Sequence, residues 1–229
     1  MSVPDSATLK RHVGCARLCK YNYRKNDNNA FVLNRKQKKT TYIVIKGSST
    51  IRHWRHNINV SLNNLGVHKG FEGYAIECME ELIDLYSDEA FEYLLQNTDH
   101  LILTAHSLGA AALLLLLFDI LYHNKLCQKL EHLDIELVFF GMPMVGSELF
   151  RTKISTLLRK KKTPQLKVYN YSIQNDYATQ SPPLPGYTKV LETIVLDAKI
   201  LNNFYSNHSI ENYIRNLLLK IDEQNHSSP

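Results

Sequence analysis

The stretch LILTAHSLGAAALLLLLF, Leu101–Phe118, decides the fold class of this protein. It allows three interpretations: the start of a membrane span, a buried strand followed by a buried helix, or a turn that carries a nucleophilic serine. Its uninterrupted apolar run, Ala110–Phe118, is about half of the roughly 20 residues that a membrane-spanning helix needs. Extending the run upstream brings in His106 and Ser107, which are polar. We therefore predict a short buried strand and a helix covered by its own domain, and no transmembrane segment.

Strands and helices are predicted to alternate on both sides of this stretch. The β-rich runs AFVL and TTYIVIKG flank the basic NRKQKK and are typical of a hairpin. Further strand-like runs are HLILTA, IELVFFGMP and QLKVYNYSIQND. Helical spacing of apolar residues is found in Ala7–Tyr23, Glu72–Asn97, Gly109–Asn124 and Glu148–Lys162. This alternation predicts an α/β fold with a central, mostly parallel sheet flanked by helices, as a single domain over residues 1–229.

The helical run Glu72–Asn97 offers one specific packing prediction. An amphipathic helix buries the stripe on which its apolar residues recur every three or four positions. The residues expected on that buried stripe are Ile76, Met79, Leu82, Ile83 and Tyr86.

The composition indicates a globular chain and limits its partners. With 229 residues, of which 44% are apolar, the chain can bury a large core. The formal charge of +5 includes two basic patches, NRKQKK and LRKKK, which could meet an anionic partner but are more typical of solvated turns. Neither patch is interleaved with aromatic residues as a nucleic-acid platform requires, so no nucleic-acid partner is expected.

Cysteine spacing and the N-terminus bear on cofactors and location. The four cysteines, at positions 15, 19, 78 and 127, do not form the paired spacing of a zinc site. We expect them to be reduced core residues, and we expect no metal and no organic cofactor. The N-terminal MSVPDSATLKRH lacks the apolar segment of a signal peptide, which indicates an intracellular protein, cytoplasmic or peripheral on membranes.

Between the predicted strand and helix stands AHSLG, Ala105–Gly109. A serine at a sharp strand-to-helix turn points its Oγ outward at the carboxyl edge of the sheet, and small residues two positions on either side let strand and helix approach. The first small residue is usually Gly, and Ala105 stands there in this chain. The helix N-terminus also gives the Leu108 N–H a place in an oxyanion hole. This context favours Ser107 as a nucleophile over a structural serine.

Several motifs in order resemble one family, the class 3 lipases, which are fungal-type triacylglycerol lipases of the α/β-hydrolase fold. The resemblance extends from about Thr40 to Tyr213. The segments that carry it are YIVIKGSSTIRHW, VHKGF, TAHSLGAAAL, FFGMPMVG, NDYATQSPP and NHSIENY. It implies an α/β-hydrolase fold with a short helical lid.

The resemblance assigns roles to individual residues. Ser107 corresponds to the nucleophile, Asp176 to the acid and His208 to the base, in the chain order expected of α/β hydrolases. Ser48 corresponds to the second oxyanion residue, which donates from its backbone N–H and its hydroxyl, opposite Leu108. The rival for the acid is Asp197, which ends the strand-like ETIVLD.

Other histidines are weaker candidates for the base. His68, in VHKGF, is expected to be structural, and His106 is expected to point away from the turn. His123 and His132, near the end of the central helix, are expected to meet solvent.

A lid is predicted in STIRHWRHNI, which follows Ser48. Ile51, Trp54 and Ile58 fall on one side of a helix there, with arginines and histidines around the rest. The alternative is an ordinary surface helix with Trp54 packed inward. As a lid, the segment would open at a lipid surface and expose its apolar side to acyl chains.

These observations predict a serine carboxylic-ester hydrolase, a lipase that cleaves acyl esters of glycerol or related lipids through an acyl-enzyme. Its partners would be the lipid ester and, transiently, a membrane or lipid-droplet surface. A phospholipase or acyltransferase with the same triad is an alternative. A catalytically inactive lipid- or protein-binding member of the fold is another. The oligomeric state is left open.

Overall fold

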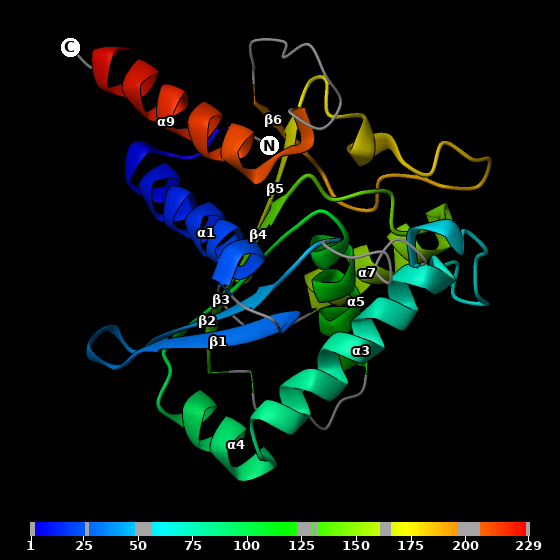
Figure 1. Cartoon of the computed structure of the whole chain (residues 1–229), viewed down its shortest axis with the longest axis horizontal. Coiled ribbons are helices and arrows are strands. Elements are labelled where there is room, and N and C mark those ends of the chain that lie inside the picture. Colours follow the sequence, from blue (N-terminus) through cyan, green and yellow to red (C-terminus); the bar gives the residue numbers. More distant parts are fainter. Residues whose placement is uncertain are drawn as a thin grey trace.

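The computed structural model describes residues 3–25, 28–48, 56–122, 130, 132–160, 166–196 and 207–227. Its centre is a six-stranded sheet in the order β1-β2-β3-β4-β5-β6 (Figure 1). The strands are β1 (Ala30–Arg35), β2 (Thr40–Ile45), β3 (His100–His106), β4 (Asp134–Phe140), β5 (Leu166–Ile173) and β6 (Ile194–Leu196). The β1 and β2 pair is antiparallel and every other neighbouring pair is parallel. The predicted hairpin and the mostly parallel α/β sheet are therefore confirmed.

Helices cover both faces of the sheet (Figure 1). One face carries α3 (Lys69–Leu85), α5 (Leu108–Tyr122) and α7 (Glu148–Lys160), with α4 (Asp88–Gln96) at the end of α3. The other face carries α1 (Ser6–Lys25) and α9 (Ile210–Ser227), which lie side by side. Two short 3-10 helices, η1 (Lys36–Lys38) and η2 (Tyr177–Gln180), complete the described elements. The first and last helices of the chain thus close one face together.

Strand periodicity explains why both faces are apolar. Successive side chains of a strand point to opposite faces, so a strand buried on both sides is apolar throughout. In β2, Ile43 and Ile45 join the core under α3 and α5, and Val44 joins the core under α1 and α9. Helix α5 lies within the first core, and nearly all of its residues are buried. This burial accounts for the leucine run of the opening stretch, and no described helix combines the length and apolarity that crossing a bilayer requires.

The predicted packing of Glu72–Asn97 is wrong in two respects. The run forms two helices, because Ser87 accepts a hydrogen bond from Ala90 N and caps a new helix there. Ile76 and Ile83, expected to be buried, are 54% and 53% exposed. Of the other predicted residues, Leu82 is buried, and Met79 and Tyr86 are partly buried against the core. The buried stripe of α3 consists of Gly70, Phe71, Tyr74, Ala75, Cys78 and Leu82. It lies about one position, or 100°, around the helix from the predicted stripe, since aromatic and cysteine side chains fill the core in place of the isoleucines.

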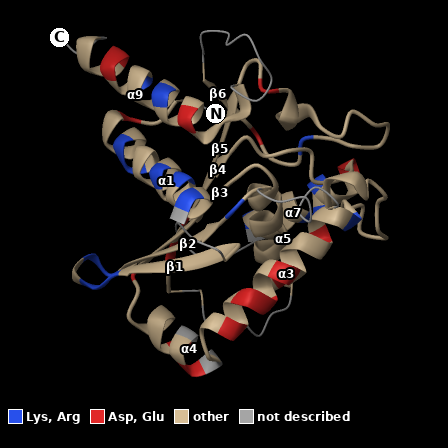
Figure 2. Ribbon diagram, in the orientation of Figure 1, with Lys and Arg blue, Asp and Glu red and all other residues tan. Residues whose placement is uncertain are grey.

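The basic patch NRKQKK forms the turn of the hairpin, where Lys36–Lys38 has no buried residue. Figure 2 shows this turn and helix α1 as places where Lys and Arg gather. The described part of LRKKK ends at Lys160. Cys15, Cys19 and Cys78 are buried and unpaired, as predicted, and Cys127 lies outside the described residues.

Candidate active site

Ser107 lies at the turn between β3 and α5, at the carboxyl edge of the sheet. Its φ of 59° is in the left-handed region, which L-residues other than Asn and Asp rarely adopt. The backbone holds this conformation, because Ser107 N donates to the main-chain oxygen of Phe140 at 2.9 Å. Gly109 lets the turn approach β2, since a Cβ there would lie 2.6 Å from the Ile45 carbonyl oxygen. Ala105 is fully buried in β3 and fits the position that Gly usually takes.

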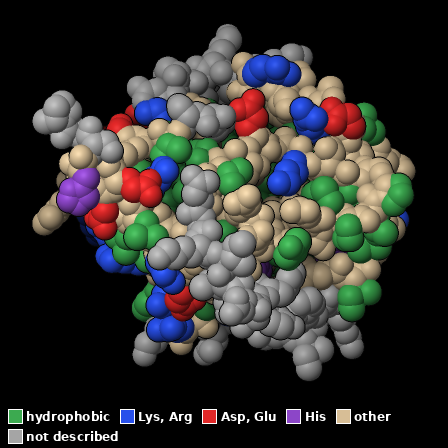
Figure 3. All heavy atoms as spheres, turned by 90° about the horizontal axis from the view of Figure 1, so that it is seen from above, with side chains coloured by type: hydrophobic (Ala, Val, Ile, Leu, Met, Phe, Trp, Pro, Cys, Tyr) green, Lys and Arg blue, Asp and Glu red, His purple; other side chains and the backbone are tan. Residues whose placement is uncertain are grey.

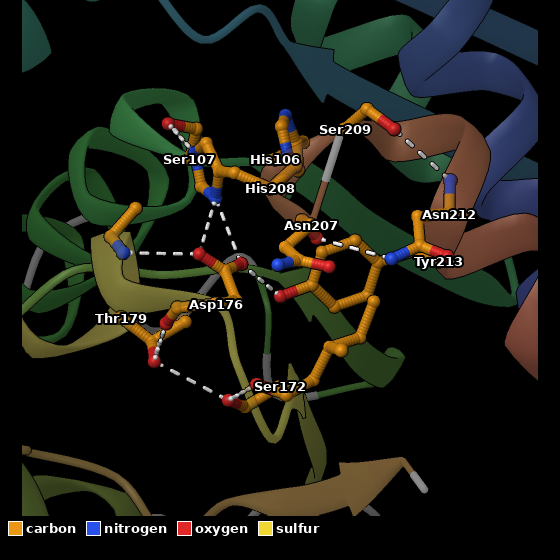
Figure 4. A network of polar contacts seen from close by, with 12 residues as sticks. His106, Ser107, Ser172, Asp176, Thr179, Asn207, His208, Ser209, Asn212 and Tyr213 are labelled. Carbon is orange, nitrogen blue, oxygen red and sulfur yellow. Dashed lines mark hydrogen bonds and ion pairs between the residues drawn. The ribbon is translucent and has the colours of Figure 1, made fainter. Parts of the chain in front are cut away.

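The structure brings the three predicted triad residues together (Figure 4). His208 Nε2 lies 2.7 Å from Ser107 Oγ, and His208 Nδ1 lies 2.8 Å from Asp176 Oδ2 and 2.9 Å from Oδ1. Asp176 follows β5, and His208 stands just before α9, so three separate segments supply the groups. Asp176 is buried, whereas the side chain of His208 is 18% exposed and reaches the cavity. This is a continuous hydrogen-bonded chain from a hydroxyl, through an imidazole, to a buried carboxylate.

Asp176 is held by further donors. Its Oδ1 accepts from the main-chain N of Ala178 at 3.0 Å, which caps η2. Its Oδ2 accepts a short hydrogen bond from the hydroxyl of Tyr213. Burial, and then the charge of Asp176, raises the pKa of Tyr213 well above its usual value, so the phenol stays protonated and donates. Tyr213 was not predicted as a site residue, although it lies in the NHSIENY segment that resembles the lipases.

His106, which was expected to point away from the turn, lines the same cavity as Ser107, but its ring nitrogens contact other residues. Its Nε2 lies 2.8 Å from the main-chain oxygen of His208, and its Nδ1 lies 2.9 Å from the Tyr23 hydroxyl. Burial, and then the neighbouring His208, lowers the pKa of His106 well below its usual value, so its ring is neutral. A neutral ring satisfies both contacts when Nε2–H donates to the carbonyl and Nδ1 accepts from Tyr23. No sequence signal pointed to Tyr23, because α1 is remote from the serine motif along the chain.

A cavity of about 380 Å³ opens beside Ser107, within the size range of small-molecule sites. Ser48 and Leu108, the predicted oxyanion residues, both line it. The amide of Asn57 donates to Ser48 Oγ at 3.1 Å, which leaves the hydroxyl hydrogen of Ser48 free for another acceptor. Asn57 was not predicted, although it lies inside the segment interpreted as a lid. Apolar lining residues are Phe71, Leu108, Pro143, Ala178, Pro182 and Ile210, and uncharged polar side chains such as Tyr23, Ser181 and Ser209 also line the cavity.

The predicted lid is described only at its end. Ile51 and Trp54 lie outside the described residues. Ile58 is 73% exposed and is not part of the cavity lining. The lid therefore stays a prediction.

The rival residues take other places. Asp197 lies outside the described residues, as does His123, and His132 is exposed. His68 is buried and structural: its Nδ1 accepts from Phe71 N at 3.2 Å and caps α3, while its ring stacks on that of Phe71. Across the described ranges, no cluster of three His, Cys, Asp or Glu side chains could hold a metal ion.

Gly141, after β4, shapes the pocket around the imidazole. Its φ is +62°, and a Cβ there would lie 3.0 Å from His208 Cε1 and 3.1 Å from Asp176 Oδ2. The absent side chain thus makes room for the contact between imidazole and carboxylate.

Known proteins resemble both the sequence and the fold. The family described as Lipase (class 3) matches residues 42–186. A lipase of Rhizomucor miehei is 33% identical over 130 residues, which are 54% of this chain and 34% of that protein, so the chain spans about a third of its relative's length.

Two solved structures show the likeness of fold. The Rhizomucor miehei lipase propeptide complex has a TM-score of 0.60 and 21% identity, covering 81% of this chain and 67% of that one. Lip2 lipase from Yarrowia lipolytica has a TM-score of 0.65 and 17% identity, covering 92% and 84%. At these identities the likeness concerns the fold alone.

Proposed function

The chain belongs to the class 3 lipase family, and on this basis we propose that it is a serine carboxylic-ester hydrolase acting on acyl esters of glycerol or related lipids. The observation that carries the proposal is the hydrogen-bonded chain from Ser107 Oγ through His208 to Asp176. A structural serine needs neither a left-handed backbone nor an imidazole at 2.7 Å. The same series of hydrogen bonds argues against an inactive binding member of the fold.

In the first half-reaction, His208 Nε2 removes the Ser107 proton as Oγ attacks the ester carbonyl carbon. The carbonyl oxygen becomes an oxyanion, and the Leu108 N–H, the Ser48 N–H and the Ser48 hydroxyl stabilise it, with Asn57 orienting that hydroxyl. Asp176 fixes the imidazole tautomer and stabilises its cation. His208 then gives the proton to the leaving alcohol, and the acyl group remains on Ser107.

In the second half-reaction, His208 removes a proton from water, and the resulting hydroxide attacks the acyl carbon. The tetrahedral intermediate collapses, the carboxylic acid leaves, and His208 returns its proton to Ser107 Oγ. No step calls for a metal or an organic cofactor. The apolar lining of the cavity suits an acyl chain, which supports a lipid ester over a polar one.

Covalent labelling tests the nucleophile. We expect a fluorophosphonate probe to label the wild type and p-nitrophenyl esters to be cleaved, and we expect Ser107→Ala to lose both. The matched control is Ser61→Ala, which changes an exposed serine whose hydroxyl contacts only Asn59 among the described residues and should behave as the wild type. An unlabelled wild type would overturn the proposal and favour a binding module.

A lid over residues 51–58 is part of the proposal, supported by the exposed apolar side chain of Ile58. Its opening at a membrane or lipid-droplet surface predicts a higher rate on aggregated than on monomeric ester. Equal specific rates above and below the solubility limit of p-nitrophenyl butyrate would remove the lid from the mechanism.

A further inference from the structure

Three charged side chains line the same cavity as Ser107. Lys20 and Arg24 come from α1, and Glu211 comes from the first turn of α9. Lys20 Nζ lies 3.4 Å from Glu211 Oε1, and an Arg24 guanidinium nitrogen lies 3.1 Å from the same oxygen. Figure 2 shows the two helices side by side, with basic residues along α1 and an acidic residue at the start of α9. A charged group therefore lines the same cavity as the reacting serine, together with apolar and uncharged polar side chains.

The charges of this group do not balance. Two cations share one carboxylate oxygen, which leaves a net charge of +1 at the cavity. Their side chains are 31%, 62% and 47% exposed for Lys20, Arg24 and Glu211, so they form the outer part of the lining. Exposed ion pairs of this kind add little to stability, with a median of about 0–1 kcal/mol. Tying α1 to α9 is thus a small part of what this group can do.

Arg and Lys are the residues that recognise phosphate oxygens, Arg through two parallel N–H donors and Lys as a point charge. A phosphodiester carries one negative charge, which matches the excess charge of the group. A neutral acylglycerol brings no charge to it.

We propose that the substrate of this site is a glycerophospholipid, whose phosphodiester binds Lys20 and Arg24 while its acyl ester reaches Ser107. The inference rests on the proposed ester hydrolysis and specifies its substrate class. The buried apolar lining with Phe71 and Leu108 takes the acyl chain, and the more exposed, charged lining takes the headgroup. Glu211 sets the selectivity among headgroups: its carboxylate repels an additional negative charge and attracts a positively charged ammonium group.

The headgroup arrangement predicts a selective loss in the double variant Lys20→Gln, Arg24→Gln. Substrates are phosphatidylglycerol, phosphatidylcholine and diacylglycerol with the same acyl chains, each in uncharged detergent micelles, together with soluble p-nitrophenyl butyrate. We expect kcat/KM on both phospholipids to fall about tenfold, the effect of losing hydrogen bonds to a charged group. Activity on diacylglycerol and on p-nitrophenyl butyrate should stay within about twofold of the wild type, because neither touches the two cations.

The matched control is Lys10→Gln, Arg17→Gln, which removes the same charge from the same helix at residues that do not line this cavity. It should leave phospholipid hydrolysis unchanged. In addition, Glu211→Gln should raise the rate on phosphatidylglycerol relative to phosphatidylcholine. Thermal unfolding of each variant shows whether the contact between α1 and α9 survives.

Three results would overturn the proposal: no phospholipid hydrolysis by the wild type, an equal loss on phospholipid and diacylglycerol, or an equal loss in the control pair. A wild type that cleaves p-nitrophenyl butyrate but no phospholipid refutes the headgroup assignment alone. A wild type that cleaves nothing and resists the fluorophosphonate refutes the proposed hydrolase as well.

Discussion

His106 Nε2 lies 2.8 Å from the main-chain oxygen of His208. His106, the residue before Ser107, therefore holds the backbone of His208, whose ring contacts the serine hydroxyl. The two imidazole rings are 4.7 Å apart between centroids, and that of His106 is neutral. The His208 carbonyl can only accept, so Nε2 of His106 carries the hydrogen, and the Tyr23 hydroxyl donates to the remaining Nδ1. In this way α1 contributes to a site whose reacting groups all lie elsewhere.

Replacing Tyr23 with Phe tests this support. Without the phenol donor, Nδ1 of His106 loses its partner, and the ring is held less firmly against the His208 carbonyl. A small misplacement of a catalytic group is costly, so we expect kcat on p-nitrophenyl butyrate to fall about tenfold with KM within about twofold. Tyr21→Phe, on the same helix but 54% exposed, should match the wild type. Unchanged kcat in Tyr23→Phe would assign the contact to stability only.

Replacing Tyr213 with Phe removes a buried donor from Asp176. A buried acceptor that loses one partner costs about 1–3 kcal/mol, so the free energy of unfolding should fall by this amount in urea titrations. The carboxylate also becomes freer to turn away from His208, so labelling by a fluorophosphonate should slow about tenfold. Tyr93→Phe, at a 67% exposed position, is the control. Labelling at the wild-type rate would show that Ala178 N and His208 hold Asp176 without the phenol.

Replacing Gly141 with Ala tests the room left for the imidazole. The added Cβ would crowd both His208 and Asp176, and the φ of +62° is unfavourable for Ala. We expect esterase activity to fall at least tenfold, since the imidazole must move. The matched control is Gly14→Ala in α1, where a Cβ meets nothing within 4 Å. That change should raise the free energy of unfolding by about 0.5–1 kcal/mol, because Ala favours a helix over Gly, and should leave activity unchanged.

The buried His68 predicts how stability depends on pH. Burial lowers the pKa of His68 to about 4, whereas the unfolded chain has the ordinary value near 6.5. Between these values the unfolded state binds the proton and the folded state does not, so stability falls as pH decreases from 6.5 toward 4. The slope reaches about 1.4 kcal/mol per pH unit for this one group.

Urea unfolding at pH 7 and pH 5 measures the effect. His68→Asn keeps a side chain that can cap α3 and removes the titrating group, so the difference between the two pH values should shrink. It should not vanish, because burial also lowers the pKa of His12 and of His106. His132→Asn, at an exposed position, should keep the wild-type difference. An equal difference in His68→Asn and wild type would contradict the assignment.

Local patterns were sufficient for the order of the elements and for the position of the serine. Apolar strands that alternate with helices are typical of a parallel sheet buried on both faces, and the carboxyl edge of such a sheet gathers the loops after its strands. Ser107 was therefore predictable from this local pattern, and Asp176 and His208 were predictable through the resemblance of NDYATQSPP and NHSIENY to the class 3 lipases. The buried face of α3 was not predictable in this way, because periodicity indicates only that some stripe of the helix is buried. In the structure Tyr74 and Cys78 lie in the core, and Ile76 and Ile83 are exposed.

By itself, the sequence determined a buried strand, a sharp turn and an apolar helix in Leu101–Phe118, because that pattern allows little else. Only the tertiary structure decided which further side chains support the residues of the candidate site. Tyr23, Asn57 and Tyr213 act through hydrogen bonds whose partners are 83, 9 and 37 positions away. Side-chain hydrogen bonds depend on distances of about 3 Å in space, and separation along the chain does not encode them.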